Sequence, residues 1–243
     1  MPAGKKFRIA YVRAPIAELA AATAAAGKAA GASFDSLVTL TQGGPARWSE
    51  TVTVKGVLGE VEDQKTLARL RKAANPNPDR LREVEAAPYV VDTIPLPEAN
   101  PYGSWMRVGG LDFLDGNRAV ISTWSGDVWI SSPLDAKLEQ ITWRRFAAGL
   151  HHPLGLRVVG GVIHVLGRDQ ITRLRDLDGD GEADAYECFN NDVKNTSNFH
   201  EFAFDLQVDA RGNFYFLKGG PVNPGGHGWG PLSPHHGCIF RLP

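Results

Sequence analysis

A motif that occurs three times along the chain limits the folds that this sequence can adopt. Each copy consists of a short alternating strand pattern, a turn that contains glycine, and a second strand rich in β-branched or aromatic residues. A third strand pattern follows each copy, at 127–130, 171–174 and 238–242. The first strands carry equivalent leucines, Leu111, Leu156 and Leu206, which lie 45 and 50 residues apart. A four-stranded propeller blade has this period.

The repeats therefore predict an all-β fold: a β-propeller fragment of about three four-stranded blades over residues 89–243, with further outer strands at 142–146 and 186–189. Because a propeller covers its blade faces by packing each blade on the next, we expect three blades to leave the flanks of the first and the last exposed. A β-sandwich with irregular strand spacing is the alternative.

The repeat is absent upstream of residue 87. Residues 1–60 are predicted to be a small α+β remnant of a preceding domain, with an Ala-rich helix between Pro15 and Gly31 and a strand at 50–55. Residues 61–88 read as a charged linker or insertion, helical at 66–70 and broken by the Asn-Pro-Asn-Pro run that begins at Asn75.

Composition excludes several classes of function. The net charge is -1 and basic residues do not cluster, which argues against nucleic-acid binding. No apolar run is long enough to span a membrane. The Ala-rich run follows basic residues but is interrupted by Glu18 and Lys28, so we predict no signal peptide in this chain.

The two cysteines, Cys188 and Cys238, are far apart and form no CxxC or CxxCH motif. The sequence therefore contains no zinc ribbon, redox dithiol or site for attached c-type haem. Two buried free thiols are favoured, and a disulfide between them is the alternative.

An acidic loop follows the third strand of the second repeat. Its spacing matches the D-x-D-x-D-G-x5-E calcium pattern, in which hard oxygen atoms alternate along the loop and a glycine stands at the sharp turn. The predicted calcium ligands are Asp176, Asp178, Asp180, Glu182 through its backbone carbonyl, Asp184 and Glu187.

The flanks of this loop read as strands, so the loop would belong to a hairpin and not to an EF-hand. A strand that begins near Tyr186 can aim Glu187 away from the ion. A hairpin without metal is the alternative, although carboxylates packed in one turn repel each other in the absence of a cation.

Seven histidines are present, and none forms an i, i+4 pair on a helix. Pairs at 151–152 and 235–236 precede strands, and His164 lies within a strand, where a packed core residue is expected. A Gly/Pro-rich loop at 219–230 carries His227 and Trp229. Loops of this length are typically functional, but this one has no phosphate-binding motif.

Several stretches between Tyr89 and Pro243 resemble a known family. They include Gly126-Asp127-Val128-Trp129, Pro153-Leu154-Gly155-Leu156, the run from Leu166 to Leu174, Phe199-His200-Glu201 and Lys218-Gly219-Gly220-Pro221. Together they resemble large bacterial propeller proteins called membrane-bound dehydrogenases or haem-binding propeller proteins. These are similar to the quinoprotein glucose and aldose sugar dehydrogenases that use pyrroloquinoline quinone (PQQ).

The resemblance implies a larger propeller of about six blades, located in the periplasm or secreted. It implies oxidation of a sugar or alcohol hydroxyl by hydride transfer to PQQ, with a cytochrome c domain or protein as electron acceptor. His200 precedes the first strand of the third repeat, where such dehydrogenases carry a catalytic histidine, and it is the predicted base. The residues after His200 depart from the family pattern.

Two interpretations follow. In the first, the chain is part of a PQQ-dependent dehydrogenase with a calcium-stabilised blade, and is inactive without the remaining blades. In the second, it is a non-catalytic calcium-binding propeller module for glycan or protein binding, and His200 is a loop histidine that holds hydrogen bonds.

Overall fold

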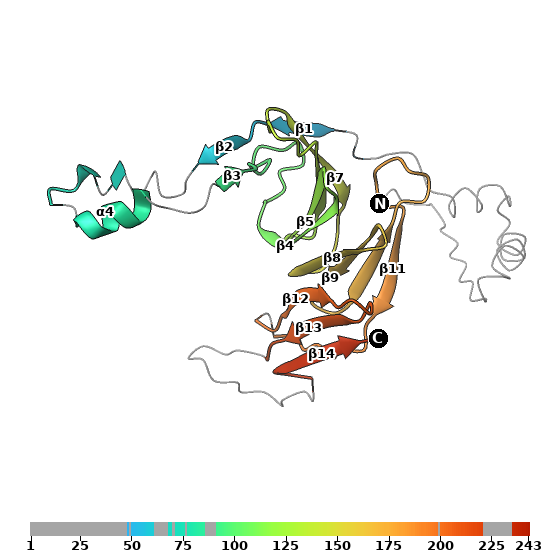
Figure 1. The fold of residues 1–243 in the computed structure, drawn as a ribbon. Helices are drawn as coiled ribbons and strands as arrows, with labels where there is room; N and C mark the ends of the chain where they lie inside the picture. Colours follow the sequence, from blue (N-terminus) through green and yellow to red (C-terminus); the bar gives the residue numbers. More distant parts are fainter. Residues whose placement is uncertain are drawn as a thin grey trace, which may run out of the picture.

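The computed structural model describes residues 48, 50–60, 68–69, 71–75, 77–85, 91–198, 200–220 and 235–243. The predicted Ala-rich helix, His227 and Trp229 lie outside these residues. Within the described part, the fold is all-β, built from several small antiparallel sheets, with helical residues at 68–69, 71–72 and 78–85 to the side (Figure 1).

The strands of the first predicted repeat form the largest sheet, with the order β1-β7-β6-β5-β4. Four of these strands are consecutive in the chain: β4 (Val108–Asp115), β5 (Arg118–Thr123), β6 (Val128–Ser132) and β7 (Ile141–Ala147). The fifth, β1 (Thr51–Val54), comes from the region predicted to be an N-terminal remnant and pairs with the outer edge of β7.

The second and third repeats form one sheet each, again from consecutive strands. The second sheet contains β8 (Gly155–Val159), β9 (Val162–Leu166), β10 (Ile171–Arg175) and β11 (Ala185–Asn190). The third contains β12 (Ala203–Val208), β13 (Phe214–Lys218) and β14 (Cys238–Leu242). All the strands that the sequence predicts in these three repeats are confirmed, with ends that shift by one or two residues.

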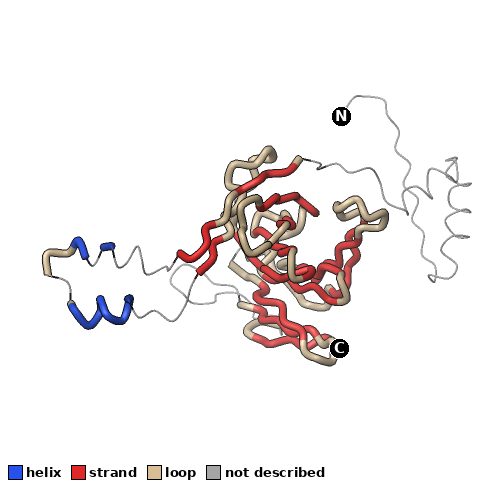
Figure 2. The backbone as a smooth tube through the Cα atoms, turned by 45° about the horizontal axis from the view of Figure 1, so that its top comes forward, coloured by secondary structure: helices blue, strands red, loops and turns tan. Residues whose placement is uncertain are grey.

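The predicted linker contains the helix α4 (Pro78–Glu85), which lies apart from the strands (Figure 2). Pro78 begins the helix, where its missing N–H costs nothing, and the Asn77 side chain accepts a hydrogen bond from the Asp79 backbone N–H at 2.9 Å. On either side of this segment, β2 (Val57–Glu60) pairs with β3 (Val91–Thr93). No helix in the described ranges has the length and apolar character that crossing a membrane requires.

The three sheets lie next to each other in chain order (Figure 1). Their first strands are neighbours, because β4 contacts β8 and β8 contacts β12. The backbone N–H of Asp205 donates to the carbonyl of Leu154 at 2.9 Å. At Gly155 the backbones approach so closely that an added Cβ would lie 2.7 Å from the Leu206 nitrogen. This approach requires a residue without a side chain.

Three apolar clusters hold the sheets together. One, which includes Val120, Val128, Leu156 and Leu174, fills the space between the first and second sheets, and another does so between the second and third. The third cluster covers the other face of the first sheet, where Trp129 and Trp143 pack under Leu96 and Tyr102. The flank of the first sheet is therefore covered, contrary to the expectation that both outer flanks are exposed.

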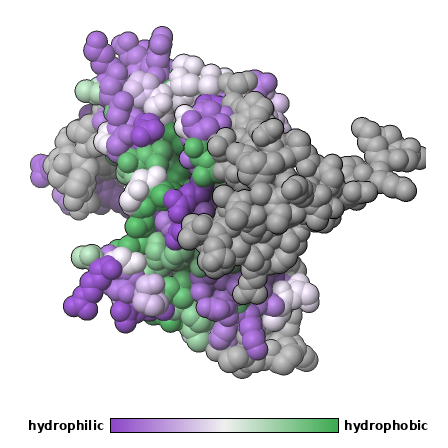
Figure 3. All heavy atoms as spheres, turned by 90° about the vertical axis from the view of Figure 1, so that its right-hand side faces the viewer, coloured by the Kyte–Doolittle hydropathy of each residue, from purple (hydrophilic) through white to green (hydrophobic). Residues whose placement is uncertain are grey.

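The third sheet does expose apolar side chains. Phe204, Leu217 and Ile239 are cross-strand neighbours and are 40%, 46% and 74% exposed. Figure 3 shows that hydrophobic residues also form a band between hydrophilic regions on one side of the molecule. The two cysteines are free thiols as predicted, but the expectation that both are buried is wrong because Cys188 is exposed.

Candidate functional site

The strand order places the predicted functional residues at two opposite ends of the sheets. We call the end with the β4–β5, β8–β9, β10–β11 and β12–β13 connections the turn end. The other end is the loop end, and it consists of residues 105–107, 124–127, 148–154, 167–170, 191–198 and 200–202. Since β10 runs from the loop end to the turn end, the acidic loop and His200 lie at opposite ends.

Three carboxylates of the acidic loop converge at the turn end. One oxygen each from Asp176, Asp178 and Asp184 lies within 4.8 Å of the others, and these three side chains could hold a metal ion such as Ca²⁺. Carboxylate oxygens are the hard ligands that Ca²⁺ prefers, so the donor set fits this ion.

Backbone N–H groups of the loop fix these carboxylates. Gly179 and Gly181 donate to the two oxygens of Asp176 at 2.8 and 2.9 Å, and Leu177 donates to Asp184 at 2.8 Å. Gly181 has φ +85°, a left-handed conformation in which glycine carries no strain. The glycine that the calcium pattern requires is therefore at the position where the backbone needs it.

Asp180 lies beside the triad. Its side chain accepts a hydrogen bond from the Glu182 backbone N–H at 2.9 Å. Burial raises the pKa of Asp180, and the negative charges of Asp178, Glu182 and Asp176 raise it further. The loop brings these negative charges together, and a cation would neutralise them.

The two glutamates of the predicted set are engaged elsewhere. Glu187 lies on β11 and forms ion pairs with Arg173 at 3.4 Å and Arg175 at 3.3 Å. The Glu182 side chain is buried and pairs with Arg144 of β7 at 3.2 Å. Glu182 was expected to bind the ion through its carbonyl, so this side-chain pairing does not conflict with the prediction.

The acidic loop is also bonded to the first sheet, a contact that the sequence did not indicate. The Arg144 guanidinium donates to the Asp180 carbonyl, and the Ala183 backbone N–H donates to the Phe146 carbonyl at 2.8 Å. A Cβ at Gly181 would lie 2.6 Å from the Arg144 Nη1 atom. The conformation of the acidic loop therefore depends on its contacts with β7.

At the loop end, His200 is exposed and its backbone N–H donates to the Asn198 side chain at 2.9 Å. The next residue, Glu201, turns inward. Its Oε1 atom lies 2.9 Å from both Lys218 Nζ and His236 Nε2, and its other oxygen accepts hydrogen bonds from Thr196. Sequence reasoning missed this buried network, because its members are far apart in the chain.

Burial alone would raise the pKa of Glu201. Hydrogen bonds from Thr196 and Lys218, together with the lysine charge, outweigh this effect and lower the pKa to about 2. Glu201 is therefore an ionised structural group at neutral pH and not a proton acceptor.

The other histidines have different surroundings. His164 is 4% exposed and packs against Phe189 and Phe214, which confirms the predicted core position. His151 Nδ1 lies 3.6 Å from the Asp169 carboxylate. His152 stacks on Trp124 with ring centroids 4.4 Å apart and an angle of 4° between the planes.

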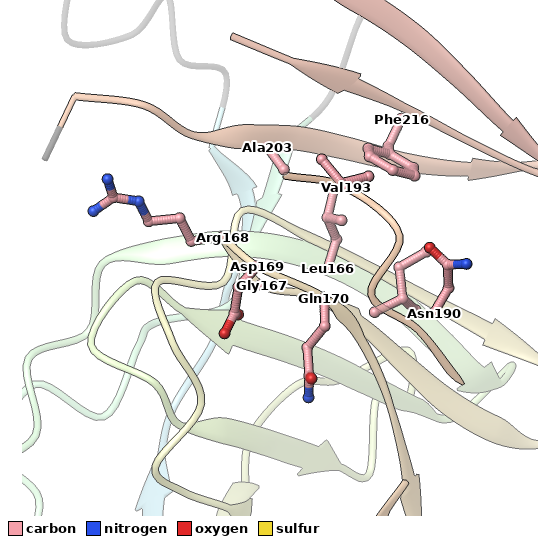
Figure 4. A pocket seen from close by; sticks show the side chains of 10 residues that line it. Leu166, Gly167, Arg168, Asp169, Gln170, Asn190, Val193, Ala203 and Phe216 are labelled. Carbon is pink, nitrogen blue, oxygen red and sulfur yellow. The ribbon is translucent and has the colours of Figure 1, made fainter. Parts of the chain in front are cut away.

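A small pocket lies at the loop end. Its lining includes Leu166, Arg168, Ala203 and Phe216 (Figure 4). Its volume is about 10 Å³, which is close to the minimum for a single water molecule. Arg168 points away from Asp169 and Gln170 in this view (Figure 4). The pocket is too small for an organic ligand.

Comparisons with known proteins add no family to this description. A scan against protein-family models and a search of curated proteins both returned no match for this chain.

Proposed function

We propose that the chain is part of a calcium-stabilised β-propeller, in which the turn end holds the ion and the loop end binds a ligand. The observation that carries this proposal is the convergence of Asp176, Asp178 and Asp184 within a loop that Arg144 bonds to the neighbouring sheet.

The arrangement of the sheets supports a propeller over a sandwich. Each repeat forms its own antiparallel sheet, and the first strands β4, β8 and β12 are neighbours. They run in the same direction, because Gly110 approaches Leu156 while the Val158 N–H donates to Asp112 at 2.8 Å. In a propeller, the first strands of successive blades surround the common axis as neighbours that run in the same direction.

Calcium would have a structural role in this propeller. The triad supplies three of the six to eight oxygen ligands that Ca²⁺ usually takes, and backbone carbonyls and water would supply the others. A bound cation would offset the repulsion among the carboxylates and fix the loop that contacts β7. The blade interface would then depend on the ion.

A binding module is the function that we favour for the loop end. The described residues there form an exposed surface of Trp105, Arg107 and His151, next to the partly buried Trp124 and His152. Aromatic and arginine side chains are the types that most often carry binding energy at protein surfaces. A glycan or a protein are the ligand classes that the sequence suggests.

A PQQ-dependent sugar or alcohol dehydrogenase is the second candidate, and the exposure of His200 favours it. An accessible imidazole could take the hydroxyl proton while hydride passes to the quinone, if the remaining blades supply the quinone site. This candidate includes a cytochrome c domain or protein as electron acceptor and a periplasmic or secreted location.

Calcium titration by calorimetry, combined with thermal melting, tests the main proposal. We expect saturable heat and a higher melting temperature with Ca²⁺, and a smaller effect with Mg²⁺, which requires stricter octahedral geometry. If Ca²⁺ produces neither heat nor a melting shift, the loop is a metal-free hairpin. A quinone-dependent activity assay on the full-length protein separates the dehydrogenase from the binding module.

A further inference from the structure

A buried arginine at the loop end has no carboxylate partner among the described residues. Arg168 is 6% exposed, and its guanidinium donates only to the backbone carbonyls of Thr196, at 3.3 Å, and Asn198. Its Nε atom is buried without a hydrogen-bond acceptor in the described part of the chain, where no carboxylate lies within ion-pair distance of Arg168. Burying a charge that only carbonyl groups compensate is costly, so the site favours an added negative charge.

The neighbouring histidine has an unusual backbone and a second unsatisfied atom. His152 has φ +45°, which is strained for a residue with a side chain, and such strain is concentrated at functional sites. Its Nδ1 atom is buried without a hydrogen-bond partner among the described residues. Burial lowers the pKa of His152, and the positive fields of His151 and Arg168 lower it further. The Arg168 charge is therefore felt at His152.

A second guanidinium lies on the other side of the ring stack. Arg107 is exposed, with its Cζ atom 3.6 Å from the Trp105 ring centroid and 5.6 Å from that of Trp124. Within the described ranges it forms no ion pair. Trp124 in turn stacks on His152, so the two arginines flank this pair of rings.

Four loop-end segments of the first and second sheets supply these groups, and Phe202 of the third sheet lies close to two of them. The Phe202 ring centroid lies 6.3 Å from that of His152 and 5.8 Å from the Arg168 Cζ atom. The nearby carboxylates are already engaged, since Asp169 faces His151 and Glu201 pairs with Lys218. The balance of unpaired charge at this site is positive, which favours an anionic ligand over a cationic one.

We propose that Arg168 and His152, with Trp124 stacked on the histidine, form a site for an oxyanion group, phosphate or carboxylate, of the ligand. Arg107, on the other side of the ring pair, attracts the anion through its charge. A guanidinium group can donate to a pair of acceptor oxygens in either anion, and such charge-assisted hydrogen bonds are strong. The inference rests on the proposed binding module and deepens it, but it does not depend on calcium.

Titration of the purified chain with sodium phosphate and with sodium acetate, at constant ionic strength set by sodium chloride, tests this site. Trp124 contributes to the fluorescence of the six tryptophans, and His152 contributes to the ¹⁵N NMR signals of the seven imidazole rings. We expect a saturable change with at least one of the two anions that chloride does not produce. The anion that saturates at the lower concentration identifies the preferred group.

Two variants locate the binding. Arg168→Gln should weaken oxyanion binding by about tenfold or more, as the loss of a charge-assisted contact does. Since Arg168 is buried and its replacement can impair folding, the exposed Arg107→Gln is the second variant, with an expected loss of severalfold. Arg211→Gln, an exposed arginine at the turn end, is the matched control and should bind as the wild type does.

The proposal is overturned if neither anion saturates beyond the chloride response, or if folded Arg107→Gln and Arg168→Gln both bind with wild-type affinity. Calcium titration of the same preparation separates this result from the proposed function. Oxyanion binding without calcium binding would refute the calcium-stabilised propeller and retain the oxyanion site. Calcium binding without oxyanion binding would retain the calcium-stabilised propeller and refute the oxyanion site.

Discussion

Glu201 and Lys218 form an ion pair, with 2.9 Å between Oε1 and Nζ, in which neither side chain is exposed to solvent. The pair connects Glu201, two residues before β12, to Lys218 at the end of β13. His236 and Asn195 extend it with further hydrogen bonds. A pair of this kind costs desolvation energy when it forms, but the loss of one partner costs more because the other charge stays buried. The network therefore fixes the loop end of the third sheet.

Glu201→Gln should lower the free energy of unfolding by about 3–5 kcal/mol, because the Lys218 ammonium group would remain buried without its counter-charge. Urea denaturation followed by circular dichroism measures this change. Asp115→Asn, which breaks the exposed pair with Arg118, is the control and should leave the denaturation midpoint nearly unchanged. Equal effects of the two substitutions would show that the Glu201 network has no special role.

The same pair predicts a pH dependence. The pKa of Glu201 is about 2 in the folded protein and 4.5 in its ordinary state, so the folded pKa is depressed. The stability that Glu201 contributes is then fully present above about pH 4.5 and is lost as the pH falls toward about 2. The difference in unfolding free energy between wild type and Glu201→Gln should shrink across this window, and a constant difference would contradict the assignment.

The acidic triad predicts which residues control calcium affinity. Asp176→Asn, Asp178→Asn and Asp184→Asn should each raise the calcium Kd by about tenfold or more, because each removes one charged ligand. Glu187→Gln should leave the Kd unchanged, since Glu187 pairs with Arg173 and Arg175 on β11. Calorimetry on the four variants checks this pattern. A loss of affinity in Glu187→Gln equal to that of the aspartate variants would return Glu187 to the ligand set.

The close contact of the first strands predicts the effect of an added methyl group. Gly155→Ala should destabilise the protein by about 1–3 kcal/mol, because the new Cβ would collide with the Leu206 backbone. Gly116→Ala in the β4–β5 turn is the matched control, since nothing lies within 4 Å of a Cβ there. Thermal melting compares the two. If both variants melt alike, β8 and β12 are not packed as described.

His200→Gln tests the dehydrogenase candidate. Since His200 is exposed, the substitution should change the free energy of unfolding by less than about 0.5 kcal/mol. If His200 is the general base, turnover of the full-length protein with PQQ and calcium should fall by about 10²–10⁴ over a panel of sugars and alcohols. Normal turnover in the variant would identify His200 as a loop residue. Absence of quinone-dependent activity in the wild type would favour the binding module.

Local patterns in the sequence predicted what depends on local interactions. Alternating side chains and glycine turns placed the strands around Leu111, Leu156 and Leu206, and the ligand spacing indicated the carboxylates that converge at Asp176. These signals are strong because each involves residues within one hairpin.

Contacts between distant residues could not be predicted in this way. The pairing of β1 with β7 joins Thr51 to Arg144, and nothing in either segment specifies its partner. The sequence around His200 does not indicate that Glu201 is buried. Its role depends on Lys218 and His236, which are distant in the chain and contact it in the fold. A single sequence carries no sign of such pairings, because they arise from the packing of whole sheets.

The opposite positions of the acidic loop and His200 affect how a protein of this kind can diverge. If the loop end binds a ligand and the turn end an ion, as proposed, a substitution among Arg107, His152 or Arg168 lies a full strand length from the triad and can change the ligand without disturbing the ion. Such a scaffold can acquire new ligand specificities while its stability is inherited unchanged, since function resides in sites carried by a fold.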